Sequence, residues 1–148
     1  MTDFESQSVR TLIALATRRT GIEPASCALA FASLGAAERL RLRLRRALAS
    51  HRVSDLQFSI LVSLFDAQPA SIPMAVLARH AAVSRSAVTD AFDDLVGAGL
   101  AERFRDSEDR RIIRGRITAA GRERADQAID DYLRAVTNAS VTGRQRER

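Results

Sequence analysis

The chain of 148 residues has the usual length of one domain, and its 46% hydrophobic content is enough for a single core. A single cysteine excludes an internal disulfide, and two distant histidines argue against a structural zinc site. All 23 basic residues are arginines, and the formal net charge of +5 permits a polyanionic partner such as nucleic acid. The first residues lack the regions of a signal peptide, and no apolar run reaches the roughly 20 residues of a membrane span. We therefore expect a cytoplasmic protein without a membrane partner.

Two helices are predicted in the N-terminal third of the chain. Apolar residues recur at helical spacing within residues 4–19, which favours a short amphipathic helix. Thr20 and Glu23 have the spacing of a capping box, which predicts that a longer helix starts with Thr20 as its N-cap and continues to about residue 50. The strict alternation of residues 40–45, LRLRLR, is also typical of a strand. Helix is favoured, because Ala, Leu and Arg are strong helix formers and no turn residue bounds the segment.

Three further helices are predicted in the middle of the chain. The first is capped by Ser54 or Asp55 and ends before Pro69, because the residue before a proline resists helical geometry. A short extended link then leads to two compact helices over residues 74–81 and 85–97. Only Ala-Val-Ser separates these two helices, which is typical of a helix-turn-helix, and Ser84 is placed to cap the second of them.

A hairpin and a last helix complete the predicted elements. Residues 100–117 alternate between apolar and charged side chains on either side of an acidic turn, which predicts two antiparallel strands. Thr118 can then cap a helix with an apolar face, which we expect over residues 119–138. The polar segment 139–148 is predicted to be a disordered tail.

The hairpin carries more opposed charge than a solvated turn requires. Residues 103–118, RFRDSEDRRIIRGRIT, contain six arginines and three acids. We expect Asp106 or Ser107 to shape the turn and Asp109 to hold an arginine in one orientation. The alternative is a solvated hairpin with surface ion pairs, each worth about 0–1 kcal/mol. The position of the arginines directly after a helix-turn-helix favours contact with DNA.

Two short helices followed by a basic hairpin form a winged helix-turn-helix, here over about residues 55–118. In this arrangement the second helix enters the major groove and the hairpin reaches the DNA backbone or the minor groove. Hydroxyl and guanidinium groups on both elements can contact phosphates and bases. The predicted DNA-binding residues are Ser84, Arg85, Ser86 and Thr89 on the helix and Arg105, Asp109, Arg110, Arg111 and Arg114 on the hairpin. The fold class is therefore mainly α with a small β-hairpin (α+β), in a single domain.

Residues 56–132 resemble the MarR family of bacterial transcriptional regulators. The resemblance is carried by LQFSILVSL and by LARHAAVSRSAVTDAFDDLVGAGLAERFRDSEDRRIIRGRITAAGR, and its most specific part, DSEDRRIIRGRITAAG, is similar to that family's wing and the start of its last long helix. The resemblance implies a homodimeric repressor that binds a palindromic operator and responds to a small ligand or to cysteine oxidation. It places the four helix residues named above, and Asp109 with Arg111, at DNA-binding positions. The helices within residues 1–50 and 119–138 would then hold the dimer together.

Three features depart from the pattern of that family. Asp90 and Asp94 occupy positions that are often basic, and they repel phosphate unless they face away or accept a hydrogen bond from cytosine N4. Ala82 stands in a turn where glycine is common, and a positive φ is costly for alanine. The last helix of the family, after residue 137, is missing, whereas residues 1–19 supply an extra one. The two acids motivate an alternative function, a winged-helix protein-interaction module that has lost operator binding.

Effector and redox residues are predicted from the same resemblance. The family's ligand pocket lies between the helices that carry Phe31, Phe58 and Phe65, although aromatic residues at helical spacing are more often core residues. Cys27 is the candidate redox residue, because one branch of the family senses hydroperoxides through a cysteine near this position; the simpler interpretation is a small buried residue. No catalytic constellation, glycine-rich phosphate loop or metal-ligand spacing is present in the sequence. We expect no enzymatic activity, no cofactor and no metal.

Overall fold

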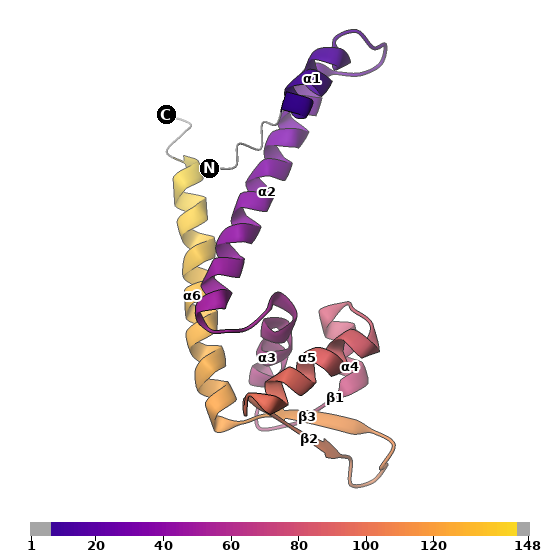
Figure 1. Ribbon diagram of the computed structural model, residues 1–148, viewed down its shortest axis with the longest axis vertical. Coiled ribbons are helices and arrows are strands. Elements are labelled where there is room, and N and C mark those ends of the chain that lie inside the picture. The colour runs from indigo at the N-terminus through magenta and orange to yellow at the C-terminus, as the bar shows by residue number, and fades with distance from the viewer. Residues whose placement is uncertain (1–6, 145–148) are drawn as a thin grey trace. The chain divides into compact units, whose positions relative to one another are not determined.

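The computed structural model describes the backbone of residues 7–144 and the side chains of residues 7–138. The chain divides into two compact units, residues 1–43 and 44–148. The first unit contains α1 (Gln7–Ala16) and most of α2 (Pro24–Ser50). The second contains the end of α2 and then α3 (Asp55–Asp66), β1 (Ile72–Pro73), α4 (Met74–Ala81), α5 (Arg85–Gly97), β2 (Ala101–Arg105), β3 (Ile113–Ile117) and α6 (Ala119–Arg144) (Figure 1). Both the mainly α composition and the small β wing agree with the sequence prediction.

The helices of the first unit expose much of their apolar surface. Leu12 of α1 is 52% exposed and Leu29 of α2 is 71% exposed. Residues 40–45 are helical, as their residue types indicated, and not a strand. Isolated exposed leucines are ordinary, but a series of them along two helices is typical of a surface that binds another apolar surface.

The prediction that Thr20 caps the second helix is wrong. Gly21 has a φ of 78°, a left-handed conformation that cannot be part of a right-handed helix, so α2 begins only at Pro24. The side chain of Glu23 accepts a hydrogen bond of 3.0 Å from the Ala25 amide and so satisfies one free N–H of the first turn. Pro24 takes the first helical position, where the N–H that it lacks is not needed.

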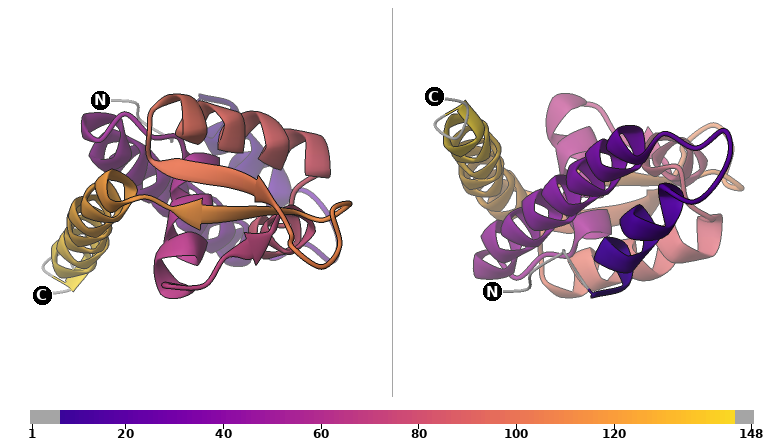
Figure 2. Two further views of the ribbon diagram at one scale, coloured as in Figure 1. Left: turned by 90° about the horizontal axis from the view of Figure 1, so that it is seen from below. Right: turned by 90° about the horizontal axis from the view of Figure 1, so that it is seen from above.

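In the second unit, α3, α4 and α5 lie on one face of a three-stranded antiparallel sheet with the order β1-β3-β2 (Figures 1 and 2). The link expected before α4 contributes the edge strand β1, in which Ile72 pairs with Gly115 of β3. α3 begins with a capping box between Ser54 and Gln57, as predicted for Ser54. The largest fully buried side chain of the core is Phe92 of α5.

Two glycines allow backbones to approach closely around this core. A Cβ on Gly115 would lie 2.5 Å from two ring carbons of Phe92, so β3 can pass beneath α5 only without a side chain at this position. A Cβ on Gly121, in the first turn of α6, would collide with the backbone carbonyl of Leu100. The close approach of Gly115 to Phe92 positions the hairpin against α5, and that of Gly121 to Leu100 sets the direction in which α6 starts.

The last helix, α6, packs against α3. The rings of Phe58 and Tyr132 lie with their centroids 4.8 Å apart, and His51 Nε2 lies 2.8 Å from Asp131 Oδ2. Thr118 caps α6 as predicted, because its Oγ1 accepts a hydrogen bond of 2.9 Å from the Gly121 amide.

The helix α6 continues to Arg144, so residues 139–144 are not the disordered tail that was expected. Extending an existing helix fixes one residue for each new hydrogen bond, and this polar segment contains no proline to stop it. The expectation of disorder for residues 145–148 lies outside the described part of the chain. None of the helices in the described residues is long and apolar enough to cross a membrane.

Candidate nucleic-acid interface

The turn between α4 and α5 depends on a left-handed alanine. Ala82 has φ 53° and ψ 39°, and its amide donates to the carbonyls of Ala78 and Arg79 at the end of α4. For an L-residue this conformation costs about 1–2 kcal/mol, which is why glycine would suit the position. Ala82 therefore has the positive φ that was considered from the sequence, and this conformation destabilises the turn relative to one with glycine.

The N-terminus of α5 is arranged by hydroxyl groups. Ser84 is the N-cap, as predicted, and its Oγ accepts a hydrogen bond of 3.2 Å from the Ala87 amide. The hydroxyl of Ser86 lies 3.1 Å from that of Ser84, and Thr89 Oγ1 donates to the Arg85 carbonyl at 2.9 Å. All of the predicted α5 residues except the partly exposed Thr89 are exposed. The first amides of a helix favour anions, so this end can bind a phosphate while the hydroxyls face a base.

The acids of α5 differ in their surroundings. Asp93 forms an ion pair of 2.7 Å with Arg103 of β2, and Asp94 Oδ2 accepts a hydrogen bond of 3.2 Å from Gln57 of α3. The carboxylate of Asp94 is thus held within the fold, although Gln57 is neutral and Asp94 keeps its negative charge. Asp90 is exposed and has no hydrogen-bond or ion-pair partner among the described residues.

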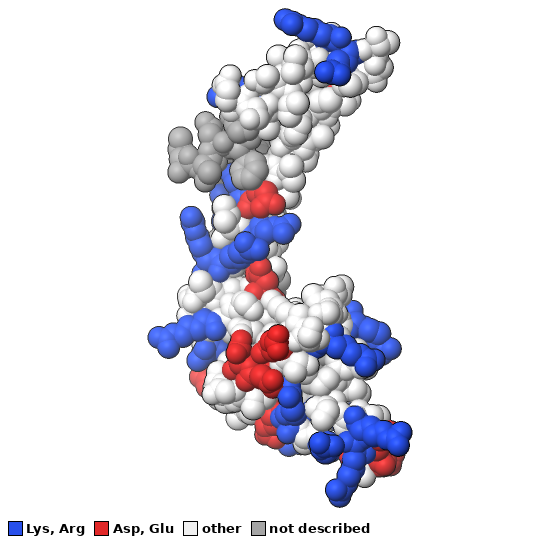
Figure 3. All heavy atoms as spheres, turned by 45° about the vertical axis from the view of Figure 1, so that its right-hand side comes forward, with Lys and Arg blue, Asp and Glu red and all other residues white. Residues whose placement is uncertain are grey.

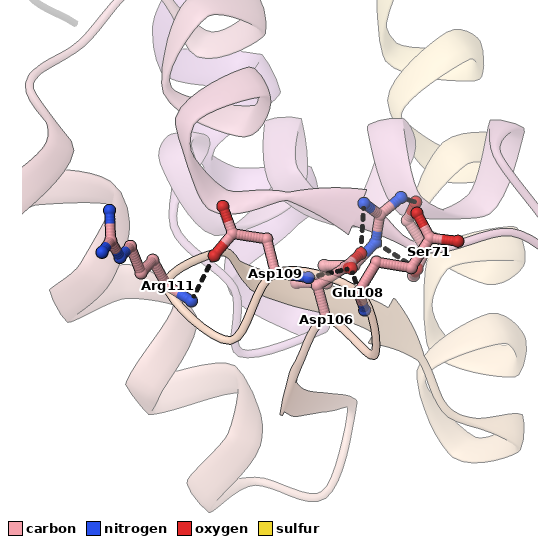
Figure 4. A network of polar contacts seen from close by, with 6 residues as sticks. Ser71, Asp106, Glu108, Asp109 and Arg111 are labelled. Atoms are coloured by element: carbon pink, nitrogen blue, oxygen red, sulfur yellow. Dashed lines mark hydrogen bonds and ion pairs between the residues drawn. The ribbon is translucent and has the colours of Figure 1, made fainter.

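Within the wing, defined as β2, β3 and their connecting turn, Asp106 organises the turn (Figure 4). Its Oδ1 accepts hydrogen bonds from the amides of Glu108, at 2.9 Å, and Asp109, at 3.1 Å. These two amides, with that of Asp109 first, and the guanidinium of Arg114 hold the pKa of the Asp106 carboxyl below its ordinary value. The prediction that Asp106 or Ser107 shapes the turn is thus met by Asp106.

Arg114 is committed to the fold of the wing. Its Nη1 pairs with Asp106 Oδ2 at 3.1 Å, its Nε donates to Ser71 Oγ at 2.9 Å, and its Nη2 donates to the Ser71 carbonyl at 3.1 Å. The residue was expected among the DNA contacts, and the contribution of Ser71 was not anticipated from the sequence. No local pattern could have indicated it, because Ser71 and Arg114 lie 43 positions apart.

Asp109 has a different partner from the one expected. Its Oδ1 accepts a hydrogen bond of 3.0 Å from the backbone amide of Arg111 (Figure 4), and the arginine side chain held by an acid of the turn is that of Arg114, held by Asp106. The expectation that Asp109 orients a guanidinium directly is therefore wrong. An aspartate side chain in a turn readily accepts from the amide two residues later, and Asp109 does so.

The six arginines of the wing fall into two groups. Four have partners: Arg103 pairs with Asp93, Arg116 pairs with Glu102 at 2.9 Å, Arg105 donates to the Arg110 carbonyl at 3.1 Å, and Arg114 is bound as described above. Arg110 and Arg111 are exposed, and within the described residues their guanidinium groups have no partner. Figure 3 shows basic side chains gathered at the free end of the hairpin. The free positive charge of the wing is thus concentrated at its turn.

The predicted effector and redox residues lie in different parts of the chain. Phe58 and Phe65 of α3 are half-buried and pack against the core of the second unit. Phe31 and Cys27 lie on the part of α2 that belongs to the first unit, and both are partly exposed. Across residues 7–138, no group of three or more His, Cys, Asp or Glu side chains could hold a metal ion.

Residues 53–113 match the model of the MarR family. This segment belongs to the MarR family. It runs from the residue before the α3 capping box to the start of β3, and so contains every predicted DNA-binding residue except Arg114. The family resemblance noted in the sequence is confirmed.

The chain is similar in sequence to one curated regulator and in fold to several solved structures. The HTH-type transcriptional repressor YetL of Bacillus subtilis (strain 168) is 28% identical over 89 residues, which are 60% of this chain and 53% of YetL. The matched region thus spans about half the length of that curated relative. The MarR-family regulator AbsC of Streptomyces coelicolor superposes with a TM-score of 0.73 at 21% identity, covering 84% of this chain and 83% of AbsC. NadR in complex with 4-hydroxyphenylacetate superposes with a TM-score of 0.62 at 25% identity, covering 78% and 82%.

Proposed function

We propose that this chain is a transcriptional regulator that binds double-stranded DNA through α5 and the wing and carries out no catalysis. The observation that carries the proposal is the pair of free guanidinium groups, Arg110 and Arg111, at the turn of a MarR-family wing. The name of YetL, a transcriptional repressor, supports repression as the mode of regulation.

Each predicted residue then has a role set by its contacts. The N-terminus of α5 enters the major groove, where Arg85, Ser86 and Thr89 face bases or phosphates and Ser84 holds the first turn. Arg110 and Arg111 follow the backbone or a narrow minor groove, whose negative potential attracts guanidinium groups. The remaining wing residues are positioning residues, namely Arg105, Asp109 and Arg114.

A symmetric homodimer and a palindromic operator belong to the same proposal. The exposed leucines of α1 and α2 supply apolar surface that a second copy of the chain would cover. Two wings related by a twofold axis require two inverted half-sites about one helical turn apart. The bound ligand of NadR supports a small-molecule effector for this chain as well, with Phe31, Phe58 and Phe65 as candidate contacts. Control through Cys27 stays a prediction.

The competing function is a protein-interaction module that no longer binds DNA, and the acids of α5 motivated it. Asp93 pairs with Arg103 and Asp94 is hydrogen-bonded to Gln57, so within the described part of the chain Asp90 is the one acid of α5 without a partner. The carboxylate of Asp90 can still accept a hydrogen bond from a base, and the free guanidinium groups of Arg110 and Arg111 favour the regulator.

A salt titration with the purified protein and a random duplex tests the proposal. Affinity for DNA should fall steeply between low and physiological salt, because each neutralised phosphate releases condensed counterions. The Arg110→Ala/Arg111→Ala double variant should reduce the slope of log affinity against log salt by about two units. A wild-type protein that shows no salt-dependent binding, and that enriches no sequence from a randomised duplex pool, would favour the interaction module.

A further inference from the structure

Asp90 lies on the face of α5 that is directed away from the core. The buried residues of this helix include Val88 and Phe92, and a position two residues from Val88 lies about 200° around the helix. Asp90 follows Ser86 by four residues, so the two side chains are neighbours on the same outer face. In a winged helix bound to DNA, this is the face that enters the major groove.

Within the described residues, Asp90 differs from the other two acids of α5 because its carboxylate has no partner. Asp93 and Asp94 also belong to α5, but Arg103 and Gln57 hold their carboxylates at 2.7 Å and 3.2 Å. Asp90 alone of the three has neither an ion-pair nor a hydrogen-bond partner in the described part of the chain. An unpaired carboxylate close to phosphates weakens every DNA complex unless a base supplies it with a donor.

The edges of the bases in the major groove discriminate strongly against a carboxylate. Ionised aspartate only accepts hydrogen bonds. Guanine presents two acceptors in the major groove, and thymine presents an acceptor and a methyl group, so both repel it. Adenine places an acceptor beside its amino group, whereas cytosine presents an amino donor without that acceptor. Cytosine is therefore the base whose edge suits Asp90.

We propose that Asp90 is a specificity-determining residue, which accepts a hydrogen bond from the N4 amino group of one cytosine in each operator half-site. The proposal rests on the proposed function, since it assumes that α5 enters the major groove. Asp90 would lower the affinity for DNA in general and restore it at sites with cytosine in the right position. The discrimination between operator and random sequence would then depend on one negative charge.

Selection from a randomised duplex pool, with the wild-type protein and three variants, tests this inference. The wild type should enrich a cytosine at one fixed position of each half-site, with at least about tenfold preference over the other bases. Asp90→Asn should shift that position towards adenine, because an amide pairs with N6 and N7 of adenine, and Asp90→Ala should lose the preference. The matched control is Asp94→Asn, which removes the same charge from the same helix and keeps an acceptor for Gln57. It should retain the cytosine.

Binding to a random duplex separates the inference from the proposed function. Asp90→Asn and Asp94→Asn should both bind random DNA somewhat more tightly than wild type, because each removes one negative charge. If Asp90→Asn and Asp90→Ala enrich the wild-type sequence unchanged, the inference is overturned and the regulator remains. If the wild type enriches no sequence and binds without salt dependence, the proposed function fails and Asp90 has no base to read. Circular dichroism and thermal melting verify that each variant is folded.

Discussion

The guanidinium of Arg114 and the carboxylate of Asp106 form an ion pair of 3.1 Å, and the same guanidinium donates two hydrogen bonds to Ser71 at the entry to β1. Through Arg114, the turn of the wing is joined to the residue that precedes β1, the edge strand next to β3. Both side chains are largely covered, at 27% and 20% exposed. Arg114 therefore helps to hold the wing in place, whereas the guanidinium groups of Arg110 and Arg111 have no partner within the described residues.

This division predicts different effects for two arginine substitutions. Arg111→Ala removes an exposed guanidinium, so affinity for duplex DNA should fall and the salt slope should decrease by about one unit, with an unchanged thermal midpoint. Arg114→Ala leaves Asp106 without its cation, so the thermal midpoint should fall as well. Arg110→Ala removes the other free guanidinium of the turn and should have the same effects as Arg111→Ala. Unchanged affinity in the Arg111→Ala variant would contradict a DNA contact at the wing turn.

DNA binding should require the side chain of Asp109 as a hydrogen-bond acceptor in the turn, and should not require its negative charge. Asp109→Ala deletes the hydrogen bond to the Arg111 amide and loosens the turn, so DNA binding should weaken although one negative charge is lost. Asp109→Asn keeps an acceptor and removes the same charge, so it should bind at least as tightly as wild type. Fluorescence anisotropy with a labelled duplex measures both variants. Tighter binding by Asp109→Ala would show that electrostatic repulsion outweighs turn geometry.

The titration of Asp106 can be followed at the two backbone amides that donate hydrogen bonds to its carboxylate. Because its pKa is lowered in the folded protein, its contribution to stability is present above the ordinary value of about 3.9 and is lost as the pH falls through the folded pKa. The NMR shifts of the Glu108 and Asp109 amides should therefore change with a midpoint below about 3.9. The stability difference between wild type and Asp106→Asn should be present at neutral pH and disappear at low pH. A midpoint above the ordinary value would mean that these hydrogen bonds do not persist in solution.

Replacing Ala82 with glycine should stabilise the protein. Glycine removes the cost of about 1–2 kcal/mol for a left-handed L-residue but adds conformational entropy to the unfolded chain, which returns about 0.5–1 kcal/mol. We expect a net gain of about 0.5–1 kcal/mol in the free energy of unfolding, measured by urea denaturation. Val83→Gly is the control in the same turn, since its φ is not positive, and it should destabilise. A loss of stability in Ala82→Gly would indicate a different turn conformation in solution.

The first unit should hold the dimer. Deleting residues 1–19 removes Leu12 and Leu15 of α1, and sedimentation should then show monomer or aggregate. Leu29→Glu places a charge on the most exposed leucine of α2 without touching the core of the second unit, so it should weaken the dimer while leaving the winged helix folded. An unchanged dimer in both variants would assign the interface to another surface.

The sequence by itself determined the elements whose stability is local. The boundaries 74–81 and 85–97, the caps at Ser54 and Ser84, and the hairpin follow from hydrogen bonds and hydrophobic periods that extend over a few residues. The MarR-family segment could be recognised for the same reason, since its wing is one continuous stretch of chain. The wrong prediction that Thr20 caps α2 also has a local cause. Gly21 adopts a positive φ, which prevents the helix from starting directly after Thr20.

The tertiary structure decided which charged groups are free. Arg111 and Arg114 are both arginines of one short hairpin, and their roles differ because Ser71, 43 positions away, lies within hydrogen-bond distance of only Arg114 in the fold. Asp94 differs from Asp90 in the same way, because Gln57 reaches it from α3 across 37 positions. A side chain's pairing depends on distances of about 3 Å between segments that sequence spacing does not relate. The packing of α3, α5 and the sheet sets those distances, and among the residues that the structure describes it leaves Asp90, Arg110 and Arg111 without partners.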